Sequence, residues 1–225
     1  MKFNIITIFP KIFDSYLNES ILKRAQKNKL IDIKIHNLRD FTKDKHHKVD
    51  DRPFGGGPGM ALKIEPLISA ISSILRIKNT ELRIKKKTKI ILFTPTGKQF
   101  DNKIAVNLAK NYDNLILICG RYEGIDARVE KVIKNLIRQS AEKISIGPYV
   151  LTGGELPAMV LIDSISRQIP GVLGKTESLE EKRHGIGMPV YTRPEIFKWK
   201  NKEYSVPKIL LSGNHKKIEE WRRKR

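Results

Sequence analysis

Residues 145–157 read SIGPYVLTGGELP, and this stretch says more about the fold than any other part of the chain. A short apolar run ends at Gly147, and Gly153 and Gly154 stand directly before a helical pattern that begins near Glu155. Glycine lets the backbone approach a ligand closely. In open α/β sheets, ligands bind beyond the carboxyl ends of strands, where these glycines fall. The stretch indicates either a binding pocket in an α/β fold or only a pair of tight turns.

Two more turns follow apolar runs that are typical of central strands in a parallel sheet. Residues 119–126, CGRYEGID, come after the run at 115–119, and residues 94–97, TPTG, come after the run at 89–93. Each turn alone indicates no more than a connection between a strand and a helix. Because the carboxyl ends of parallel strands meet at one edge of a sheet, the three turns together predict a small-molecule pocket there.

The rest of residues 1–172 alternates between strand-like and helix-like segments, which predicts a layered α/β fold with a parallel sheet. Asp101 and Asp126 are of a type that favours the start of a helix, and each precedes a helical pattern. We expect the strands at residues 3–9, 31–35, 89–93, 115–119 and 141–146, and helices after Pro10 and at 65–75, 101–110, 126–137 and 155–169.

Three segments interrupt this alternation. Residues 39–60 have no periodicity and contain four glycines, and a loop of this length is usually functional or mobile. Its part RPFGGGPGM, residues 52–60, offers backbone N–H groups that suit a phosphate or the edge of a base, or else it is a hinge. Residues 173–190 are charged and aperiodic, as in a flexible linker, and residues 191–225 predict a small helical tail.

The composition favours a polyanionic partner. The chain holds 44 Lys and Arg against 24 Asp and Glu, a net charge of +20, which is typical of proteins that bind nucleic acid. An A/T-rich genome is the alternative cause, because lysine, isoleucine and asparagine have A/T-rich codons. No apolar run approaches the ~20 residues that cross a bilayer, and the N-terminus does not have the pattern of a signal peptide. We expect a cytoplasmic protein.

Several chemistries are excluded by what the sequence lacks. The single cysteine, Cys119, rules out an internal disulfide. No phosphate-binding GxxxxGK[ST] motif, dinucleotide GxGxxG motif or GxSxG nucleophile elbow is present. His46 and His47 are adjacent, so they cannot share a metal ion on one helix face, and we assign no residue as a metal ligand. Hydrolases and kinases of the familiar types are therefore excluded.

Read together, the motifs resemble the bacterial tRNA (guanine-N1)-methyltransferase family, TrmD. Any one string is weak, but eight in order along the chain are highly specific. They are IFPKIFD (8–14), RDFT (39–42), VDDRPFGGGPGM (49–60), CGRYEGID (119–126), SIGPYVLTGGELPAM (145–159), IPGVLG (169–174), YTRPE (191–195) and LLSGNH (210–215).

The resemblance implies a SPOUT-class α/β domain over residues 1–172, with a deep trefoil knot, which is a rare exception to un-knotted chains. It also implies a small C-terminal tRNA-binding domain over residues 191–225, shortened because the sequence stops soon after Trp221. The family is homodimeric, with the active site between subunits, and depends on magnesium. It methylates N1 of the guanosine immediately 3′ of the anticodon, using S-adenosylmethionine. This atom lies on the Watson–Crick edge, which is accessible in a single-stranded loop.

The resemblance also implies roles for single residues. Arg167 would face the reacting base, and Glu123 would lie near the methionine end of the donor. The tRNA would contact Asp50, Arg52, Gly57, Pro58 and Gly59. The methyl donor would be bound by Leu92, Thr94, Pro95, Gly120, Glu123, Ile146, Gly147, Pro148, Tyr149, Val150, Leu151, Gly153, Gly154 and Pro157.

Two positions depart from the family pattern. Pro148 replaces the usual aspartate after Ile-Gly, and the general base, an aspartate in the family, falls on Lys182. Guanine N1 carries a proton near neutral pH, so a base must remove it. We predict Glu181 for this role, with Glu180 next, against the alternative that both are solvated linker charges. Two other functions remain open: a degenerate tRNA-binding protein, or a SPOUT methyltransferase of another RNA.

Overall fold

The computed structural model describes residues 1–76, 87–174, 179 and 187–223, and the chain divides into two units, Met1–Leu173 and Gly174–Arg225. Each unit has its own β structure. The first holds a five-stranded sheet and a two-stranded pair, β3 (Asp50–Asp51) with β4 (Ala61–Leu62), and the second holds an antiparallel hairpin. In these ranges, no helix has both the length and the apolar character that crossing a bilayer requires.

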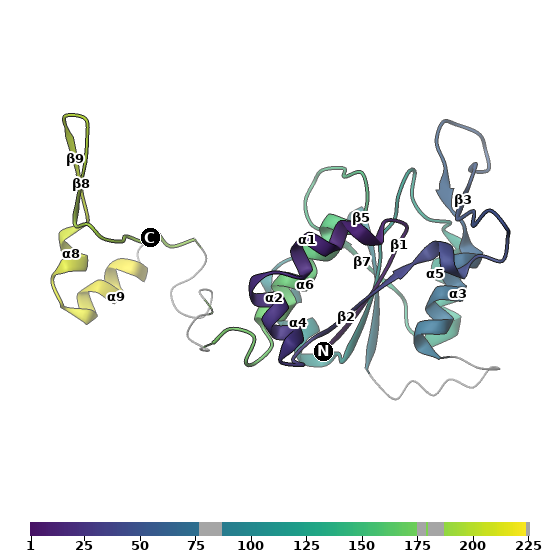
Figure 1. Ribbon diagram of the computed structural model, residues 1–225, viewed down its shortest axis with the longest axis horizontal. Helices are drawn as coiled ribbons and strands as arrows, with labels where there is room; N and C mark the ends of the chain where they lie inside the picture. Colours follow the sequence, from purple (N-terminus) through teal and green to yellow (C-terminus); the bar gives the residue numbers. More distant parts are fainter. Residues whose placement is uncertain (77–86, 175–178, 180–186, 224–225) are drawn as a thin grey trace. The chain divides into compact units, whose positions relative to one another are not determined.

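The sheet of the first unit is parallel throughout, with the strand order β2-β1-β6-β5-β7 (Figure 1). The side chains of the central strand, β6, are all buried, because helices cover both faces of the sheet. This confirms the predicted α/β class. The strands are β1 (Lys2–Thr7), β2 (Asp32–Asn37), β5 (Thr88–Gln99), β6 (Asn114–Ile118) and β7 (Glu142–Ser145).

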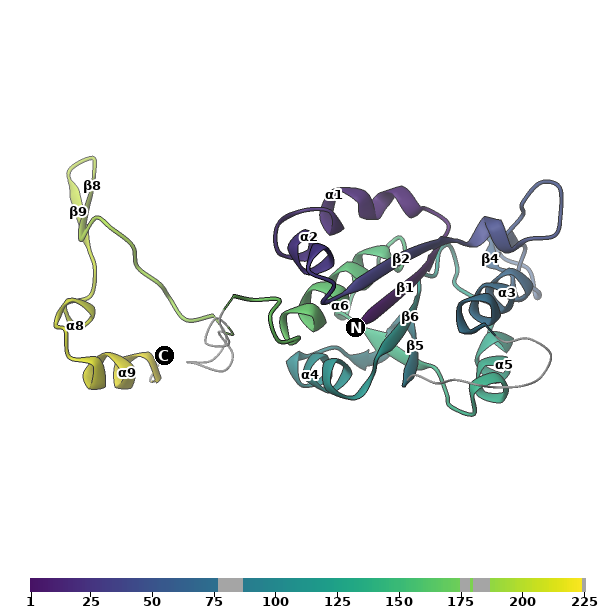
Figure 2. The same cartoon turned by 60° about the horizontal axis from the view of Figure 1, so that its bottom comes forward.

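The helices of the first unit lie in two layers (Figures 1 and 2). One face of the sheet carries α1 (Asp14–Leu17), α2 (Ser20–Lys27), α4 (Asn102–Asn111) and α6 (Glu155–Arg167). The other face carries α3 (Ile64–Leu75) and α5 (Arg128–Ile137), and two short 3-10 helices, η1 (Pro10–Phe13) and η2 (Leu38–Phe41), complete the set.

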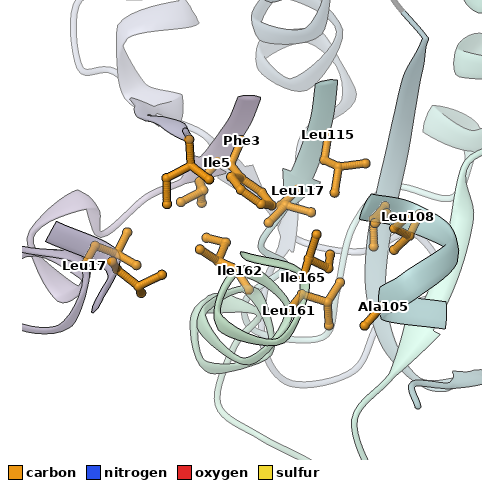
Figure 3. Close-up of a cluster of buried hydrophobic side chains, with 14 of the residues drawn as sticks. Phe3, Ile5, Leu17, Ala105, Leu108, Leu115, Leu117, Leu161, Ile162 and Ile165 are labelled. Carbon is orange, nitrogen blue, oxygen red and sulfur yellow. The ribbon is translucent and has the colours of Figure 1, made fainter. Parts of the chain in front are cut away.

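Each face of the sheet buries its own hydrophobic cluster. Figure 3 shows the larger cluster, in which Phe3, Leu117 and Ile165 bring together β1, β6 and α6. All three side chains are fully buried, and each contributes about 1.5–3 kcal/mol by leaving water. This cluster fixes α6 to the sheet, and with it the glycine turn that precedes α6.

One of the two predicted helix caps is confirmed. The Asp101 carboxylate accepts a hydrogen bond from the Ile104 backbone N–H at 2.8 Å. The cap predicted at Asp126 lies one residue before the assigned cap position, because α5 begins at Arg128 and Ala127 already has a helical backbone. The Asp126 carboxylate still accepts hydrogen bonds from the backbone N–H and the guanidinium of Arg128, as a capping side chain does.

The sequence predicted that residues 94–97 form a turn after the end of a strand, but the structure differs. These residues form a bulge inside β5, because Phe93 and Lys98 both pair with Ile144 of β7 and the strand then continues to Gln99. At Gly97, a Cβ atom would lie 2.7 Å from backbone atoms of Ile144, so only glycine fits where the strand rejoins the sheet. The bulge pushes residues 94–97 out at the carboxyl edge.

The sequence predicted a helical second unit, but this unit also contains two β-strands. Strands β8 (Ile196–Trp199) and β9 (Lys202–Ser205) form an antiparallel hairpin, followed by α8 (Lys208–Leu211) and α9 (His215–Arg223). Lys200, in the left-handed region at φ +52°, makes the turn between the strands. Aromatic and β-branched residues favour strands, and Phe197 pairs directly with Tyr204 across the hairpin.

Candidate ligand-binding site

A cavity of about 470 Å³ lies beside the bulge in β5 and the ends of β6 and β7. Its wall consists of the bulge after Phe93, the turn after Cys119 and the segment after Ser145, so the three predicted turns do meet at one edge of the sheet. This position beyond the carboxyl ends of parallel strands is where ligands bind in such folds. The volume is within the range of small-molecule sites.

The residues that the resemblance assigned to the methyl donor come together in this cavity, with the exception of Pro148. Pro148 is exposed and does not line the wall, because the chain at this point turns outward between Gly147 and Tyr149. The residues that do line it are Leu92, Thr94, Pro95, Gly120, Glu123, Ile146, Gly147, Tyr149, Val150, Leu151, Gly153, Gly154 and Pro157.

Other lining residues were missed by the sequence analysis. Arg121 and Tyr122 belong to the string CGRYEGID, so their position after a strand was a usable signal. Glu130 of α5 and Lys143 of β7 had no such signal, because only the fold brings them together, in an ion pair of 2.8 Å. The remaining missed residues are Phe93, Gly124, Ile125, Ile144, Ser145 and Thr152.

The segment after β7 is held by its own hydrogen bonds. The Ser145 hydroxyl donates to the Gly147 carbonyl at 2.9 Å and accepts from the Gly147 N–H at 3.2 Å. The Tyr149 hydroxyl donates to the Ile146 carbonyl at 3.1 Å, which folds the ring back over Gly147. A Cβ atom at Gly147 would collide with that ring. Glycine at position 147 therefore lets the loop close on itself.

The glycine-rich loop lies against the turn after β6. The Glu123 N–H donates to the Met60 carbonyl at 3.1 Å, and a Cβ atom at Gly59 would lie 2.6 Å from the Glu123 carboxylate. Near the start of the loop, the side chain of Asp50 forms a hydrogen bond with Tyr122. Burial, together with this hydrogen bond and the negative charge of Asp50, raises the pKa of Tyr122. The loop is thus attached to the cavity wall at both of its ends.

The predicted tRNA-binding residues do not line the cavity itself. Arg52, Gly57 and Pro58 are exposed, and Gly57 and Gly59 have φ values of +106° and +93°, which favour glycine. Asp50 and Gly59 contact residues 122–123 of the wall. These positions form a rim beside the cavity and are accessible to a large partner.

Of the predicted catalytic residues, the structure describes only Arg167, and this residue does not line the cavity. Arg167 is the last residue of α6 and is half-buried. Glu180, Glu181 and the neighbouring Lys182 lie outside the described residues. The arrangement of Arg167 relative to Glu181 therefore stays a prediction.

The cavity does not offer nucleophilic chemistry through Cys119. Burial raises the pKa of this thiol well above its usual range, and the negative charge of Glu155 adds to the effect. The thiol therefore stays protonated at neutral pH, and only the thiolate is a nucleophile. Among the described residues, no three His, Cys, Asp or Glu side chains gather in a way that could hold a metal ion.

The lining combines apolar side chains with exposed backbone groups and a few charges. Leu92, Ile146 and Pro157 offer apolar surface, while the glycine turns offer N–H and C=O groups and Glu123 adds a carboxylate. Such a wall suits a small molecule that has both apolar and polar or charged parts. Fold and cavity together define a parallel α/β protein with a small-molecule site at the carboxyl edge of its sheet.

Comparison with known proteins agrees with this class. The family model described as "tRNA (Guanine-1)-methyltransferase TrmD" matches residues 1–225. The chain is 48% identical over 227 residues to a tRNA (guanine-N(1)-)-methyltransferase of Dehalococcoides mccartyi, covering 100% of this chain and 85% of the relative. Proteins of the same name from Thermomicrobium roseum (50% identity; 99% of this chain, 78% of the relative) and Clostridioides difficile (47%; 99% and 91%) are similarly close. The chain belongs to the TrmD family.

Proposed function

We propose that this chain transfers the methyl group of S-adenosylmethionine to N1 of the guanosine immediately 3′ of the anticodon in tRNA. The observation that carries the proposal is the match of the family along the whole chain, joined to a cavity lined by nearly all the residues expected to bind the donor. The donor supplies an electrophilic methyl group on a sulfonium. Because tRNA is the substrate, we also propose that the protein acts in the cytoplasm.

The size and the lining of the cavity support binding of the donor. Apolar side chains such as Leu92, Ile146 and Leu151 would hold the adenine, and the backbone groups at Gly153 and Gly154 would bind its polar edge. The Glu123 carboxylate would bind the positively charged amino group of the methionine part. A cavity of about 470 Å³ is large enough for a molecule of this size.

Transfer to guanine N1 needs a base and a stabilising charge. We propose Glu181, and Glu180 as the second choice, as the group that takes the N1 proton, because a carboxylate in this part of the linker is the nearest match to the family aspartate. Negative charge that builds on the guanine oxygen would be stabilised by Arg167 at the end of α6.

We propose that the reaction depends on magnesium, as the resemblance implies. The described residues do not provide a three-ligand site, so no step is assigned to the ion. Magnesium is commonly held by one or two carboxylates together with water and substrate oxygens, and Glu123 and Glu130 are the carboxylates in the cavity wall.

We propose that the first unit contains the deep trefoil knot of the SPOUT class. The path of the chain supports this. From β7, at the edge of the sheet, the segment after Gly147 returns past β5 to the end of β6, where the Gly154 N–H donates to the Gly120 carbonyl at 3.0 Å. Helix α6 then packs on β1 and α4.

We propose a homodimer, which is supported by five exposed apolar side chains on or next to η1, α1 and α6, elements that pack together beside the cavity. Large exposed apolar patches usually mark interaction sites. Phe9 of this patch contacts the cavity wall, because the centre of its ring lies 4.7 Å from the guanidinium of Arg121. A partner on the patch would therefore complete the site. The patch is Phe9, Ile12, Tyr16, Leu156 and Val160.

We expect Leu156→Glu to convert the dimer to a monomer, because a carboxylate buried in an apolar interface lacks a partner. Light scattering during size-exclusion chromatography measures the mass directly. A wild-type chain that elutes as a monomer at micromolar concentration would contradict the dimer.

We propose that the hairpin of the second unit contacts unpaired nucleotides of the tRNA. On one face it carries Phe197, Trp199 and Tyr204, each more than half exposed, with Lys202 opposite Trp199. The Phe197 and Trp199 rings are nearly parallel, at 14°, and their centroids lie 6.5 Å apart. Aromatic rings beside cations are how proteins bind bases and phosphates of single strands.

Trp199→Ala is expected to raise the KM for tRNA by about 10- to 100-fold, because one stacked base contributes about 1–3 kcal/mol. The Kd for the donor should not change. Ile196→Ala is the matched control, since Ile196 is exposed on the opposite face of the same hairpin. Equal effects of the two variants on tRNA would argue against a stacking surface.

The decisive experiment for the function is transfer of labelled methyl groups to tRNA with guanosine 3′ of the anticodon, followed by digestion to nucleosides. We expect label in 1-methylguanosine at that position. Donor and tRNA binding without transfer would indicate a degenerate binding protein, and label in another RNA would indicate a different substrate.

A further inference from the structure

A buried ion pair links the two glycine-rich turns that form the cavity wall. Arg121 belongs to the turn after β6, and Glu155 is the first residue of α6, directly after Gly154. Arg121 Nε lies 3.1 Å from Glu155 Oε2, and the side-chain exposures are 17% and 2%. In the described structure neither atom forms a hydrogen bond, so the attraction of opposite charges is what compensates their burial.

Arg121 is fixed by further contacts on other sides. Its Nη1 donates to the Thr152 carbonyl at 3.3 Å, and its guanidinium lies 4.7 Å from the centre of the Phe9 ring. The backbone of Arg121 also forms an antiparallel bridge with Gly153. The side chain therefore joins residues 121 and 152–155 and rests on the end of β1.

Glu155 is fixed from the opposite side. The Thr7 hydroxyl donates to Glu155 Oε1 at 2.8 Å and accepts from the Phe9 N–H at 3.0 Å, and Thr7 is buried. The carboxylate is thus attached to the end of β1 by one oxygen and to the turn after β6 by the other. This connection crosses the carboxyl edge of the sheet directly behind the cavity.

The space between the two side chains leaves room only for glycine at position 153. A Cβ atom there would collide with the Arg121 side chain and with the Glu155 carboxylate. The glycine turn and the ion pair therefore fit together as one unit, and a change in either one moves the other.

We propose that Arg121 and Glu155 are positioning residues for the methyl donor: their ion pair holds the two glycine-rich turns at the spacing that donor binding needs. This rests on the proposed function, in which the donor occupies the cavity. A buried ion pair adds little net stability, because desolvation offsets the attraction of the charges. Its contribution here is a fixed geometry, and small errors in the geometry of a site have large effects.

The test is the affinity for S-adenosylhomocysteine, measured by calorimetry well below the unfolding temperature. Arg121→Leu and Glu155→Gln should each raise the Kd for S-adenosylhomocysteine by about 10- to 100-fold, the range typical of residues that orient the ligand-binding groups of a site. The double variant should bind no more weakly than the weaker single variant, because both changes break the same link. The circular dichroism spectrum of each variant at the assay temperature should stay that of the wild type, which a general loss of folding would change.

Two further variants serve as controls for this measurement. Arg121→Lys keeps a positive charge near Glu155 but cannot make the forked contacts of a guanidinium, so its Kd should lie between wild type and Arg121→Leu. Arg128→Leu breaks a more exposed arginine–aspartate pair outside the cavity lining, and its Kd should stay within about two-fold of wild type. Folded Arg121→Leu and Glu155→Gln proteins with a wild-type Kd would overturn the proposal.

Amide hydrogen exchange separates this proposal from the proposed function. Exchange at residues 120–124 and 152–154 should rise in Glu155→Gln and not in Arg128→Leu, with or without a donor. A wild-type chain that binds no S-adenosylhomocysteine would sink the proposed function, whereas unchanged exchange in Glu155→Gln would sink the positioning role.

Discussion

Gly154→Ala is expected to reduce the kcat/KM for methyl transfer by about 100-fold or more, because a displacement of ~1 Å at a site has effects of this size. The Cβ atom of alanine would lie 2.6 Å from Cys119 Cα and 3.1 Å from the Gly120 nitrogen. Carbon atoms in contact are usually about 3.5–4.0 Å apart. Since both neighbours are backbone atoms, the two turns must separate, and the hydrogen bond from Gly154 to Gly120 lengthens with them.

The measurement for Gly154→Ala is the methyl-transfer rate together with the Kd for S-adenosylhomocysteine. Gly174→Ala is the matched control, because no atom lies within 4 Å of a Cβ atom there and its φ is not in the left-handed region. We expect overpacking at Gly154 to lower the free energy of unfolding by about 1–3 kcal/mol, so the assay temperature must be low. A folded Gly154→Ala protein with wild-type affinity would contradict this account of the cavity.

The sequence was sufficient to predict the layers and the place of the site. Apolar runs that end in glycine-containing turns predicted that residues 119–126 and 145–157 meet at one edge, and they do. This works because a buried parallel strand needs continuous apolar side chains, and because all parallel strands end at the same edge. The family of the chain was also recognisable from short strings in a fixed order.

Other features depend on contacts that a linear pattern does not contain. The bulge at residues 94–97 depends on how β5 rejoins Ile144, and the pair of Glu130 with Lys143 joins a helix to a strand. The hairpin in the second unit was missed because its strands have only four residues each. The ion pair between Arg121 and Glu155 was missed for a related reason: the two residues lie far apart in the sequence, and nothing in either motif indicates burial.

The second large effect concerns the general base. Glu181→Gln is expected to lower kcat by about 10²- to 10⁴-fold, the usual contribution of a positioned acid or base, because glutamine keeps the size of the side chain but cannot take the N1 proton. The Kd for the donor and the KM for tRNA should stay near the wild-type values. Glu180→Gln is the matched control, since it removes the same charge one residue earlier.

The dependence on pH distinguishes loss of a base from loss of a linker charge. Without the base, transfer must wait until N1 loses its proton to solvent, and this becomes easier as the pH rises. The ratio of the wild-type rate to the Glu181→Gln rate should therefore fall with increasing pH, while the ratio for Glu180→Gln stays near one. A larger loss in Glu180→Gln would assign the role to Glu180. Full activity in both variants and in the double variant would mean that another group takes the proton, and the proposed role of the linker carboxylates would be wrong.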